Sequence, residues 1–375
     1  MSSDRPSALL SEVKLRPNGG GPTTLHHSGG WLYEINEIPI TTRSSFNQIS
    51  VARVNDPTDP QFLGIHTLNR DSYGFAAMNN VVFYANQLEG LVATDMTDPT
   101  APVSIGQLDI NATPHDMYIQ DGILYAHTYN RLLVVDVSDP GSMALLSDYQ
   151  VIQEHELMGF TLKDNHIIFV TSHSELIIVN VSDPSQPSVE WVHTHPPPAY
   201  YHHYRIHMSV ADDLLVYSSD STDYNFLDVS DLSNVAWLQT VSPQGHAAKP
   251  ILRNGRAYLY DEFLGLEIYD ITDPTNIFRI GLSGARHSTY GFTFLDDEIC
   301  VIGGNIYGCD IVRTGSDCSS ACPADANHDG SLSPADFSAW VAAFNTHAPE
   351  CDQNNDGSCT PADFSAWVAN YNAGC

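Results

Sequence analysis

The chain has 375 residues, of which 45 are acidic and 15 are Lys or Arg, so its formal net charge at pH 7 is −30. Such a charge disfavours binding to nucleic acid and to anionic membrane surfaces. The sequence has no run of the roughly 18 apolar residues that a membrane-spanning helix requires, so we expect no membrane span. The length suits one large domain and one small domain.

A strand followed by a turn recurs six times in the first 313 residues. Each turn contains an Asp in the sequence Ser/Thr-Asp-Pro or a close variant. The copies are at Asp56, Asp98, Asp139, Asp183, Asp231 and Asp273, spaced by 41 to 48 residues. Four short strands per repeat predict the blade of a β-propeller. Because Asp caps a turn and Pro presets φ, we interpret this Asp as structural rather than as a metal ligand.

The repeated strands resemble those of a known repeat family. Examples are LLVVDVSDP at residues 132–140 and LIIVNVSDP at residues 176–184, which resemble the LVIVD repeat. The resemblance covers nearly all of residues 1–313. It implies a propeller fold rather than a particular activity.

The number of blades follows from the two ends of the repeat region. A seventh unit stops after its third strand, at Arg313. The missing turn and strand are found at residues 3–11, where SDRPSALLS matches SDPGSMALLS at residues 138–147. We therefore predict a mainly β protein with a seven-bladed propeller over residues 1–315, in which residues 1–16 supply the outer strand of the last blade and remove exposed edges from the closure.

Histidines recur in the loops that lead into the innermost strands of several blades. The candidate ligands at this channel mouth are His115, His155, His203, His246 and His287. Neutral imidazoles that converge on the axis could hold Zn, Cu or Fe. The alternative is that these histidines cap strands or bond to backbone carbonyls without a metal. The longest insertion, residues 194–207, carries a Pro run and three Tyr, which suggests a binding loop for an unknown ligand on this face.

The last fifty residues contain one sequence twice. Residues 325–345 and 352–372 agree at 15 of 21 positions, at an offset of 27. Each copy places oxygen-bearing side chains at alternate positions of a twelve-residue loop with Gly at position six, the pattern of a Ca²⁺ loop. The candidate ligands are Asp325, Asn327, Asp329, Ser331, Ser333 and Asp336 in the first loop and Asp352, Asn354, Asp356, Ser358, Thr360 and Asp363 in the second.

A helix is predicted directly after each loop. Ser333 and Thr360 stand at N-cap positions, and each is followed by Pro and, three residues past the cap, by Asp. The apolar residues that follow have helical spacing and predict two stripes that pack against each other. These are Phe337, Trp340, Val341 and Phe344 in the first helix and Phe364, Trp367, Val368 and Tyr371 in the second.

The doubled loops and helices, with the final Gly374 and Cys375, resemble a type I dockerin module of the planctomycete-like kind. The resemblance covers residues 318–375. It implies a small α-helical domain that binds two Ca²⁺ ions and docks onto a cohesin-like or other scaffold or surface protein. It also implies that loop positions 10 and 11 face this partner, here Pro334, Ala335, Pro361 and Ala362.

Five of the seven cysteines lie in residues 318–375. Their irregular spacing favours disulfides over a metal cluster, and therefore an oxidising compartment. The expected pairs are Cys351 with Cys359, Cys300 with Cys309, and Cys375 with either Cys322 or Cys318. The first ten residues lack the apolar core of a signal peptide, so we expect the signal of an extracellular or cell-surface protein to lie upstream of residue 1.

Two classes of function fit these features. We favour an exported, non-catalytic recognition or display propeller attached through its calcium-dependent tail. The alternative is a propeller enzyme, either a polysaccharide hydrolase or lyase or an oxidoreductase with a histidine-bound metal at the channel mouth. The sequence has no nucleophile elbow, phosphate-binding loop, zincin pattern or dinucleotide-binding turn, so no catalytic residue is assigned. A further alternative is a tail that only sorts or anchors the protein through Cys375.

Overall fold

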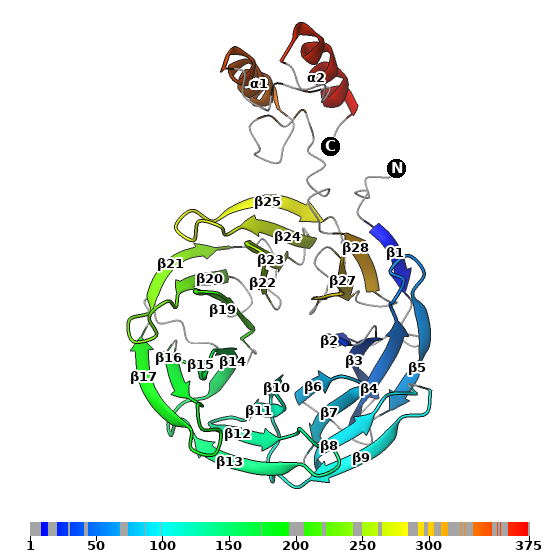
Figure 1. Ribbon diagram of the computed structural model, residues 1–375, viewed down its shortest axis with the longest axis vertical. Helices are drawn as coiled ribbons and strands as arrows, with labels where there is room; N and C mark the ends of the chain where they lie inside the picture. The colour runs from blue at the N-terminus through cyan, green and yellow to red at the C-terminus, as the bar shows by residue number, and fades with distance from the viewer. Residues whose placement is uncertain are drawn as a thin grey trace.

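Short β-strands make up most of the described residues, and two helices follow them at the C-terminal end (Figure 1). The computed structural model describes residues 9–13, 21–28, 31–40, 44–67, 74–86, 88–98, 100–173, 175–194, 206–219, 223–242, 250–261, 265–283, 292–295, 299–303, 309–313, 324, 326, 333–346, 351, 353 and 359–373.

The described strands form seven sheets of four strands each, arranged in a ring. Six sheets use four consecutive strands. The first three are β2 (Gly21–Ser28), β3 (Trp31–Ile40), β4 (Ser44–Arg53) and β5 (Gln61–Thr67); β6 (Gly74–Met78), β7 (Val81–Asn86), β8 (Gly90–Asp95) and β9 (Val103–Leu108); and β10 (Asp116–Gln120), β11 (Ile123–His127), β12 (Arg131–Asp136) and β13 (Ala144–Gln150).

The next three sheets continue around the ring in the same way. They are β14 (Leu157–Lys163), β15 (His166–Thr171), β16 (Glu175–Asn180) and β17 (Ser188–Thr194); β18 (Met208–Ala211), β19 (Leu214–Ser219), β20 (Asp223–Asp228) and β21 (Ala236–Val241); and β22 (Ile251–Arg253), β23 (Arg256–Asp261), β24 (Gly265–Asp270) and β25 (Phe278–Ser283).

The seventh sheet joins the two ends of the ring. It contains β26 (Phe292–Phe294), β27 (Ile299–Gly303), β28 (Cys309–Arg313) and, as its outer strand, β1 (Leu9–Val13). β1 runs antiparallel to β28, with Leu9 opposite Val312 and Val13 opposite Cys309. This is the pairing of chain ends that the repeat pattern predicts. The inner strands β2 and β26 lie beside each other, which brings the last sheet against the first.

Hydrophobic cores lie between neighbouring sheets. One core joins β6–β9 to β10–β13 through residues such as Phe83 and Leu133, and the next joins β10–β13 to β14–β17 through residues such as Leu132 and Phe169. The outer strands are more exposed, with exposed and half-buried residues alternating on β17. The ring is therefore stabilised mainly by its inner three strands.

Two-residue turns connect the first and second strands of most sheets. The first turn residue has a positive φ, between 50° and 54°, in five of them: Asn79, Asp121, Asp164, Asp212 and Asn254. Asn and Asp tolerate the left-handed region better than other non-Gly residues, and two-residue hairpins require it. These turns therefore follow from local sequence.

The repeated Asp turns connect the third and fourth strands. In the second sheet, an oxygen of Asp95 accepts the backbone amide of Thr97 at 2.8 Å, and an oxygen of Asp98 accepts the amide of Thr100 at 3.0 Å. The hydroxyl of Thr100 donates to the same Asp98 oxygen at 2.6 Å. Equivalent bonds recur around the ring, so the Asp of the repeat is a turn residue, as expected.

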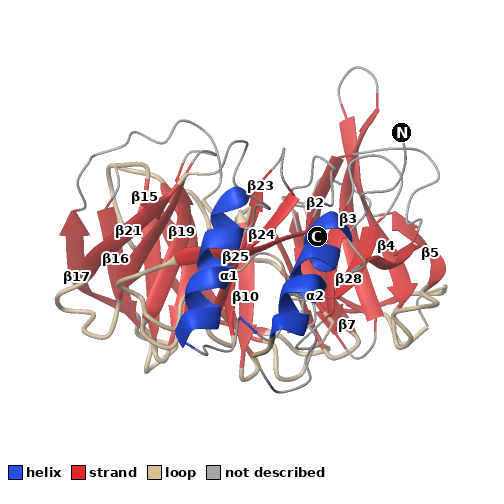
Figure 2. Cartoon of the chain, turned by 90° about the horizontal axis from the view of Figure 1, so that it is seen from above, coloured by secondary structure: helices blue, strands red, loops and turns tan. Residues whose placement is uncertain are grey.

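Two helices, α1 (Pro334–Thr346) and α2 (Pro361–Ala373), form a separate small unit. They lie side by side in both views (Figures 1 and 2). Their shared core consists of Ala324, Ala326, Trp340 and Trp367, with Phe344 and Tyr371 packed against it. Among the described residues, no helix is long and apolar enough to cross a membrane.

Removal of residues 1–16 is expected to destabilise the ring, because β28 then loses its outer neighbour β1 and keeps only β27. Loss of about three strand hydrogen bonds corresponds to about 3 kcal/mol, so the melting temperature followed by circular dichroism should fall by several degrees. Removal of residues 1–8, which keeps β1, is the matched control. An equal melting temperature for the two deletions would contradict this role of β1.

Acid is expected to weaken the Asp turns. Hydrogen bonds from the Thr100 hydroxyl and then from its amide hold the pKa of the Asp98 carboxyl below its usual value. A carboxyl whose pKa is lower in the folded state adds stability above its unfolded pKa, and this stability is lost as pH falls through the folded pKa. Asp98→Asn keeps an oxygen acceptor but does not titrate. It should melt below the wild type at neutral pH, and the gap should shrink toward about pH 3.

Thermal melts at several pH values measure this gap. Asp98→Ala, which removes the acceptor itself, should stay below the wild type throughout the range. A gap for Asp98→Asn that does not change with pH would show that the charge of Asp98 is irrelevant to the turn.

Candidate functional site

Two buried carboxylates stand at equivalent places in the helical unit. Asp336 and Asp363, at position 12 of the two loops, have no exposed surface. Asp336 accepts the backbone amide of Ser333 at 2.7 Å, and Asp363 accepts that of Thr360 at 2.7 Å. The predicted capping pattern is confirmed in both helices.

Position 9 of each loop contacts the same carboxylate. The hydroxyl of Ser333 donates to Asp336 at 3.3 Å, and the hydroxyl of Thr360 donates to Asp363 at 3.1 Å. The other Asp363 oxygen accepts the amide of Gln353 at 3.0 Å. The remaining candidate ligands lie outside the described residues: Asp325, Asn327, Asp329, Ser331, Asp352, Asn354, Asp356 and Ser358.

The charge around these carboxylates favours a cation. Residues 314–375 contain seven Asp and one Glu but no Lys or Arg. An ionised carboxylate without exposed surface needs a positive partner as well as hydrogen bonds. A hard divalent cation with oxygen ligands suits this donor set, so the residues described at Ser333, Asp336, Thr360 and Asp363 fit Ca²⁺.

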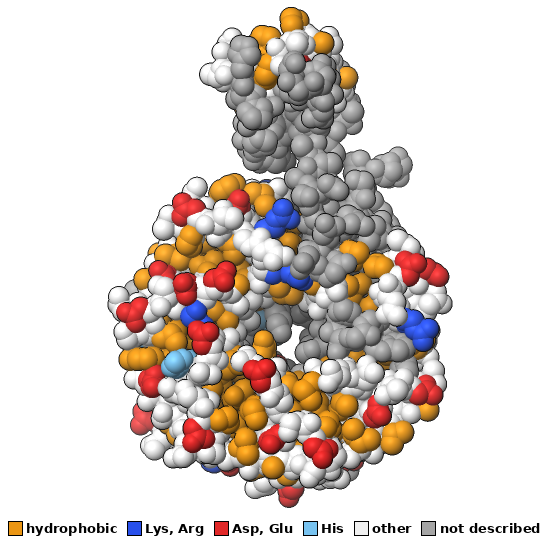
Figure 3. All heavy atoms as spheres, viewed as in Figure 1, with side chains coloured by type: hydrophobic (Ala, Val, Ile, Leu, Met, Phe, Trp, Pro, Cys, Tyr) orange, Lys and Arg blue, Asp and Glu red, His pale blue; other side chains and the backbone are white. Residues whose placement is uncertain are grey.

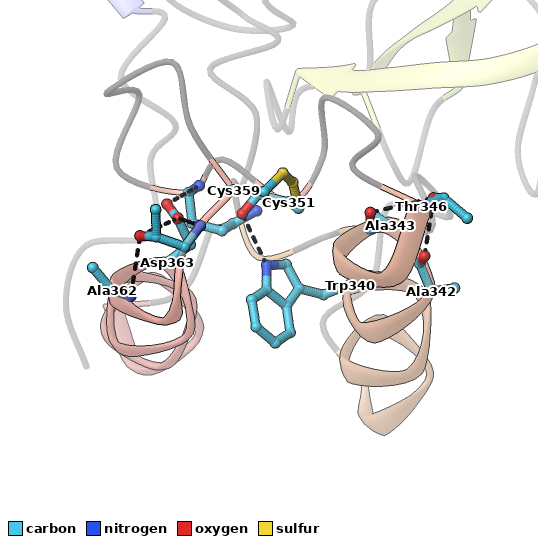
Figure 4. Close-up of a disulfide and its surroundings, with 10 residues drawn as sticks. Trp340, Ala342, Ala343, Thr346, Cys351, Cys359, Ala362 and Asp363 are labelled. Carbon is cyan, nitrogen blue, oxygen red and sulfur yellow. Dashed lines mark hydrogen bonds between the residues drawn. A yellow bond between two sulfur atoms is a disulfide. The ribbon is translucent and has the colours of Figure 1, made fainter.

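One disulfide closes the second loop (Figure 4). Cys351 and Cys359 are bonded, with their Cα atoms 5.5 Å apart and a sequence separation of 8. This is the expected pair. Cys318, Cys322 and Cys375, for which another pair is expected, lie outside the described residues.

The expected pair of Cys300 and Cys309 is wrong. Cys300 is a free, buried cysteine. It lies opposite Val312 in the β27–β28 pair, whereas Cys309 lies opposite Gly303. Three strand positions correspond to about 10 Å, which is too far for a disulfide. Burial raises the pKa of the Cys300 thiol, which keeps it protonated.

An exposed apolar face runs across the two helices. It consists of Phe337 and Val341 on α1, 41% and 36% exposed, and their repeat equivalents Phe364 and Val368 on α2, 45% and 37% exposed. The rings of Phe337 and Phe364 lie 5.9 Å apart. The predicted stripes do meet, but two short helices cover only one edge of each stripe. We call these four residues the Phe/Val face.

Two of the candidate histidines, His115 and His155, each lie beside another imidazole. The rings of His155 and His173 lie 3.6 Å apart, and those of His115 and His127 lie 5.6 Å apart. The buried Nδ1 of His155 has no hydrogen-bond partner. His127 is the last residue of the second strand of its sheet, and His173 comes two residues after the second strand of its own. Neither is therefore evident from the loops before the first strand.

Of the five histidines predicted to converge, His115 and His155 are among the described residues. His203, His246 and His287 lie outside the described residues. Within the described part of the chain, no three His, Cys, Asp or Glu side chains are grouped as metal ligands. The ring contacts of His115 and His155 described above are to His127 and His173.

Comparison with known proteins supports the repeat and the fold. The LVIVD repeat family matches residues 121–151 and 166–191, which contain the last three strands of the third sheet and most of those of the fourth. The chain therefore carries LVIVD repeats. No curated protein matches it.

Solved structures match the fold of most of this chain, and one of them is described as a β-propeller domain. The β-propeller domain of Cps50 (Swd1) from Myceliophteria thermophila matches with a TM-score of 0.58 and 9% identity, over 80% of this chain and 98% of that one. Sqt1 from Saccharomyces cerevisiae matches with a TM-score of 0.57 and 8% identity, over 82% and 99%. The computationally designed Ika8 protein matches with a TM-score of 0.53 and 9% identity, over 82% and 100%. At these identities the similarity establishes the fold alone.

The disulfide is expected to hold the second loop when calcium is removed. A disulfide that closes so short a loop is worth about 2–3 kcal/mol. The paired substitution Cys351→Ala with Cys359→Ala should therefore make the helical unit sensitive to protease after chelation, at a concentration that leaves the wild type intact. Reductant added to the wild type should reproduce this sensitivity, and equal resistance of both proteins would show that the disulfide is dispensable.

Proposed function

We propose that the protein is a recognition or display propeller, held to a scaffold or surface protein by its C-terminal helical unit in a calcium-dependent way. The observation that carries this proposal is the pair of fully buried carboxylates, Asp336 and Asp363, in a unit without Lys or Arg. Ca²⁺ in each loop would place positive charge beside these carboxylates. It would also link metal binding to folding, since a unit of this size has a small core.

The Phe/Val face is the surface proposed to meet the partner. Exposed apolar patches rimmed by polar residues are typical of interaction sites. Because the helical unit is acidic and lacks basic side chains, the complementary partner has an apolar patch bordered by Lys or Arg. A cohesin-like protein with such a surface is the proposed partner.

The ring is proposed to present its loops to a ligand of unidentified chemistry. It is hollowed at its centre (Figure 3), and loops 109–115 and 151–156 carry His115 and His155 to the inner strands. The Cys351–Cys359 disulfide supports placement of the protein outside the cell or at its surface.

Metal analysis of the purified protein tests the first part of this proposal. We expect two Ca²⁺ per chain, with loss of one ion in Asp336→Asn and of the other in Asp363→Asn. Stoichiometric Fe, Cu or Zn that disappears in His155→Ala would instead favour a metal-dependent oxidoreductase. A protein without bound Ca²⁺ in millimolar calcium would contradict the calcium site.

Attachment is tested with the surface and exported proteins of the producing cell. The full chain should bind one of them in calcium and release it in chelator, and the substitutions Phe337→Ser and Phe364→Ser should abolish binding. Phe62→Ser, an exposed Phe on the ring, is the matched control. Binding that persists in chelator, or in a chain without residues 318–375, would rule out the helical unit as the attachment site.

A further inference from the structure

Two equivalent hydrogen bonds cross between the halves of the helical unit. The indole nitrogen of Trp340 on α1 donates to the carbonyl of Cys351 at 3.2 Å (Figure 4), and that of Trp367 on α2 donates to the carbonyl of Ala324 at 3.1 Å. The two Trp are 27 residues apart, as are the two acceptors. One bond is therefore made twice, each time from the helix of one copy to the loop of the other.

The acceptors mark where the loops begin. Ala324 and Cys351 come directly before Asp325 and Asp352, which are position 1 of the two loops. Both acceptor residues and both indoles are buried. A buried carbonyl that loses its donor has no water to replace it. Each indole therefore fixes the backbone at the start of the loop in the opposite copy.

Each Trp is also tied to its own loop. Asp336, the last residue of the first loop, lies in the first turn of α1, and Trp340 follows one turn later. Asp363 and Trp367 have the same relation on α2. An ordered first loop fixes the start of α1 and thereby the position of Trp340. The Trp340 indole in turn fixes the backbone at the start of the second loop. The same path leads back from Asp363 through Trp367 to Ala324.

Aromatic packing also connects the two halves of the helical unit. The ring of Phe337 lies 5.3 Å from Trp367, and the ring of Phe364 lies 5.5 Å from Trp340. These two contacts are again related by the 27-residue repeat. Packing alone would survive a change from Trp to Phe, whereas the hydrogen bond would not. The two contributions can therefore be separated by substitution.

Resting on the proposed calcium function, we propose that the Trp340 and Trp367 bonds couple the two loops, so that Ca²⁺ in one loop raises the affinity of the other. The bonds exist only when a helix and the opposite loop are both ordered. The first ion therefore bears most of the ordering cost, and the second ion binds to a loop whose start is already fixed. Couplings of this kind typically change affinity by about 5- to 150-fold.

Calorimetric titration of the full chain with Ca²⁺ tests the coupling. Asp363→Asn, which weakens the second loop, should lower the affinity of the first loop at least about fivefold. Asp336→Asn should lower the affinity of the second loop by the same factor, because coupling free energies are reciprocal. If neither substitution changes the Ca²⁺ affinity of the other loop, the proposed coupling does not exist, whatever the effect of the Trp substitutions.

The role of the indoles is tested in a second background. In a chain with Trp340→Phe and Trp367→Phe, Asp363→Asn should change the affinity of the first loop less than about twofold, well below the usual range of coupling. Trp237→Phe, which removes an exposed indole of the ring, is the matched control and should leave the coupling intact. An unchanged coupling without both indole donors would overturn the assignment to these bonds.

The outcomes separate this inference from the proposed function. Two ions that bind independently, with a Hill coefficient of about 1, would remove the coupling and leave calcium-dependent attachment standing. A wild-type chain that binds no Ca²⁺ would overturn both. Near-ultraviolet circular dichroism of the Trp variants in saturating Ca²⁺ shows whether the helical unit still folds, and single substitutions replace the double one if it does not.

Discussion

The middle strands of each sheet are apolar on both faces, and this constraint forces the ring to close. On β12, Leu132 and Val134 point into the core shared with the following sheet, whereas Leu133 and Val135 belong to the core shared with the preceding one. Exposure of either face to water is unfavourable, so a sheet of this kind is stable only between two neighbours. An open row of such sheets would expose an apolar face at each end. Pairing of β1 with β28 and contact of β2 with β26 remove both ends at once.

The ring is largely predictable from sequence because the turns between its strands are formed by residues close together in the chain. Asp98 and Thr100 make their turn within two residues, so the chemistry of the turn is visible in the repeat. Even the closure is visible, since the fragment at Leu9–Val13 is recognisable as the strand missing after Arg313. Relations between strands are less visible. Cys300 and Cys309 lie in adjacent strands, but their registers differ by three positions, and sequence alone does not fix that offset.

The candidate site divides in the same way. The caps at Ser333 and Thr360 follow from residues three apart and are found as predicted. The contact between the His155 and His173 rings depends on how a loop folds over the end of β15, and no local pattern encodes it. The exposure of Phe337 has a similar cause. Helical spacing tells which residues share a stripe, but not how much of that stripe a short partner helix can cover.

In both the ring and the helical unit, a single repeat cannot bury its apolar surface alone. Helices of thirteen residues are marginal in isolation, and the hydrophobic cluster formed by the described residues of the unit is small, with four buried members. In the ring, seven repeats share their apolar faces around a circle. In the helical unit, two repeats share theirs across a pseudo-two-fold relation, and each also holds the backbone of the other through an indole. A small unit of this kind gains little from burial, so its stability depends on cross-links: the reciprocal Trp bonds, the Cys351–Cys359 disulfide and the proposed ions. Ordering of one half is then inseparable from ordering of the other, which is the physical reason to expect that its two loops act together.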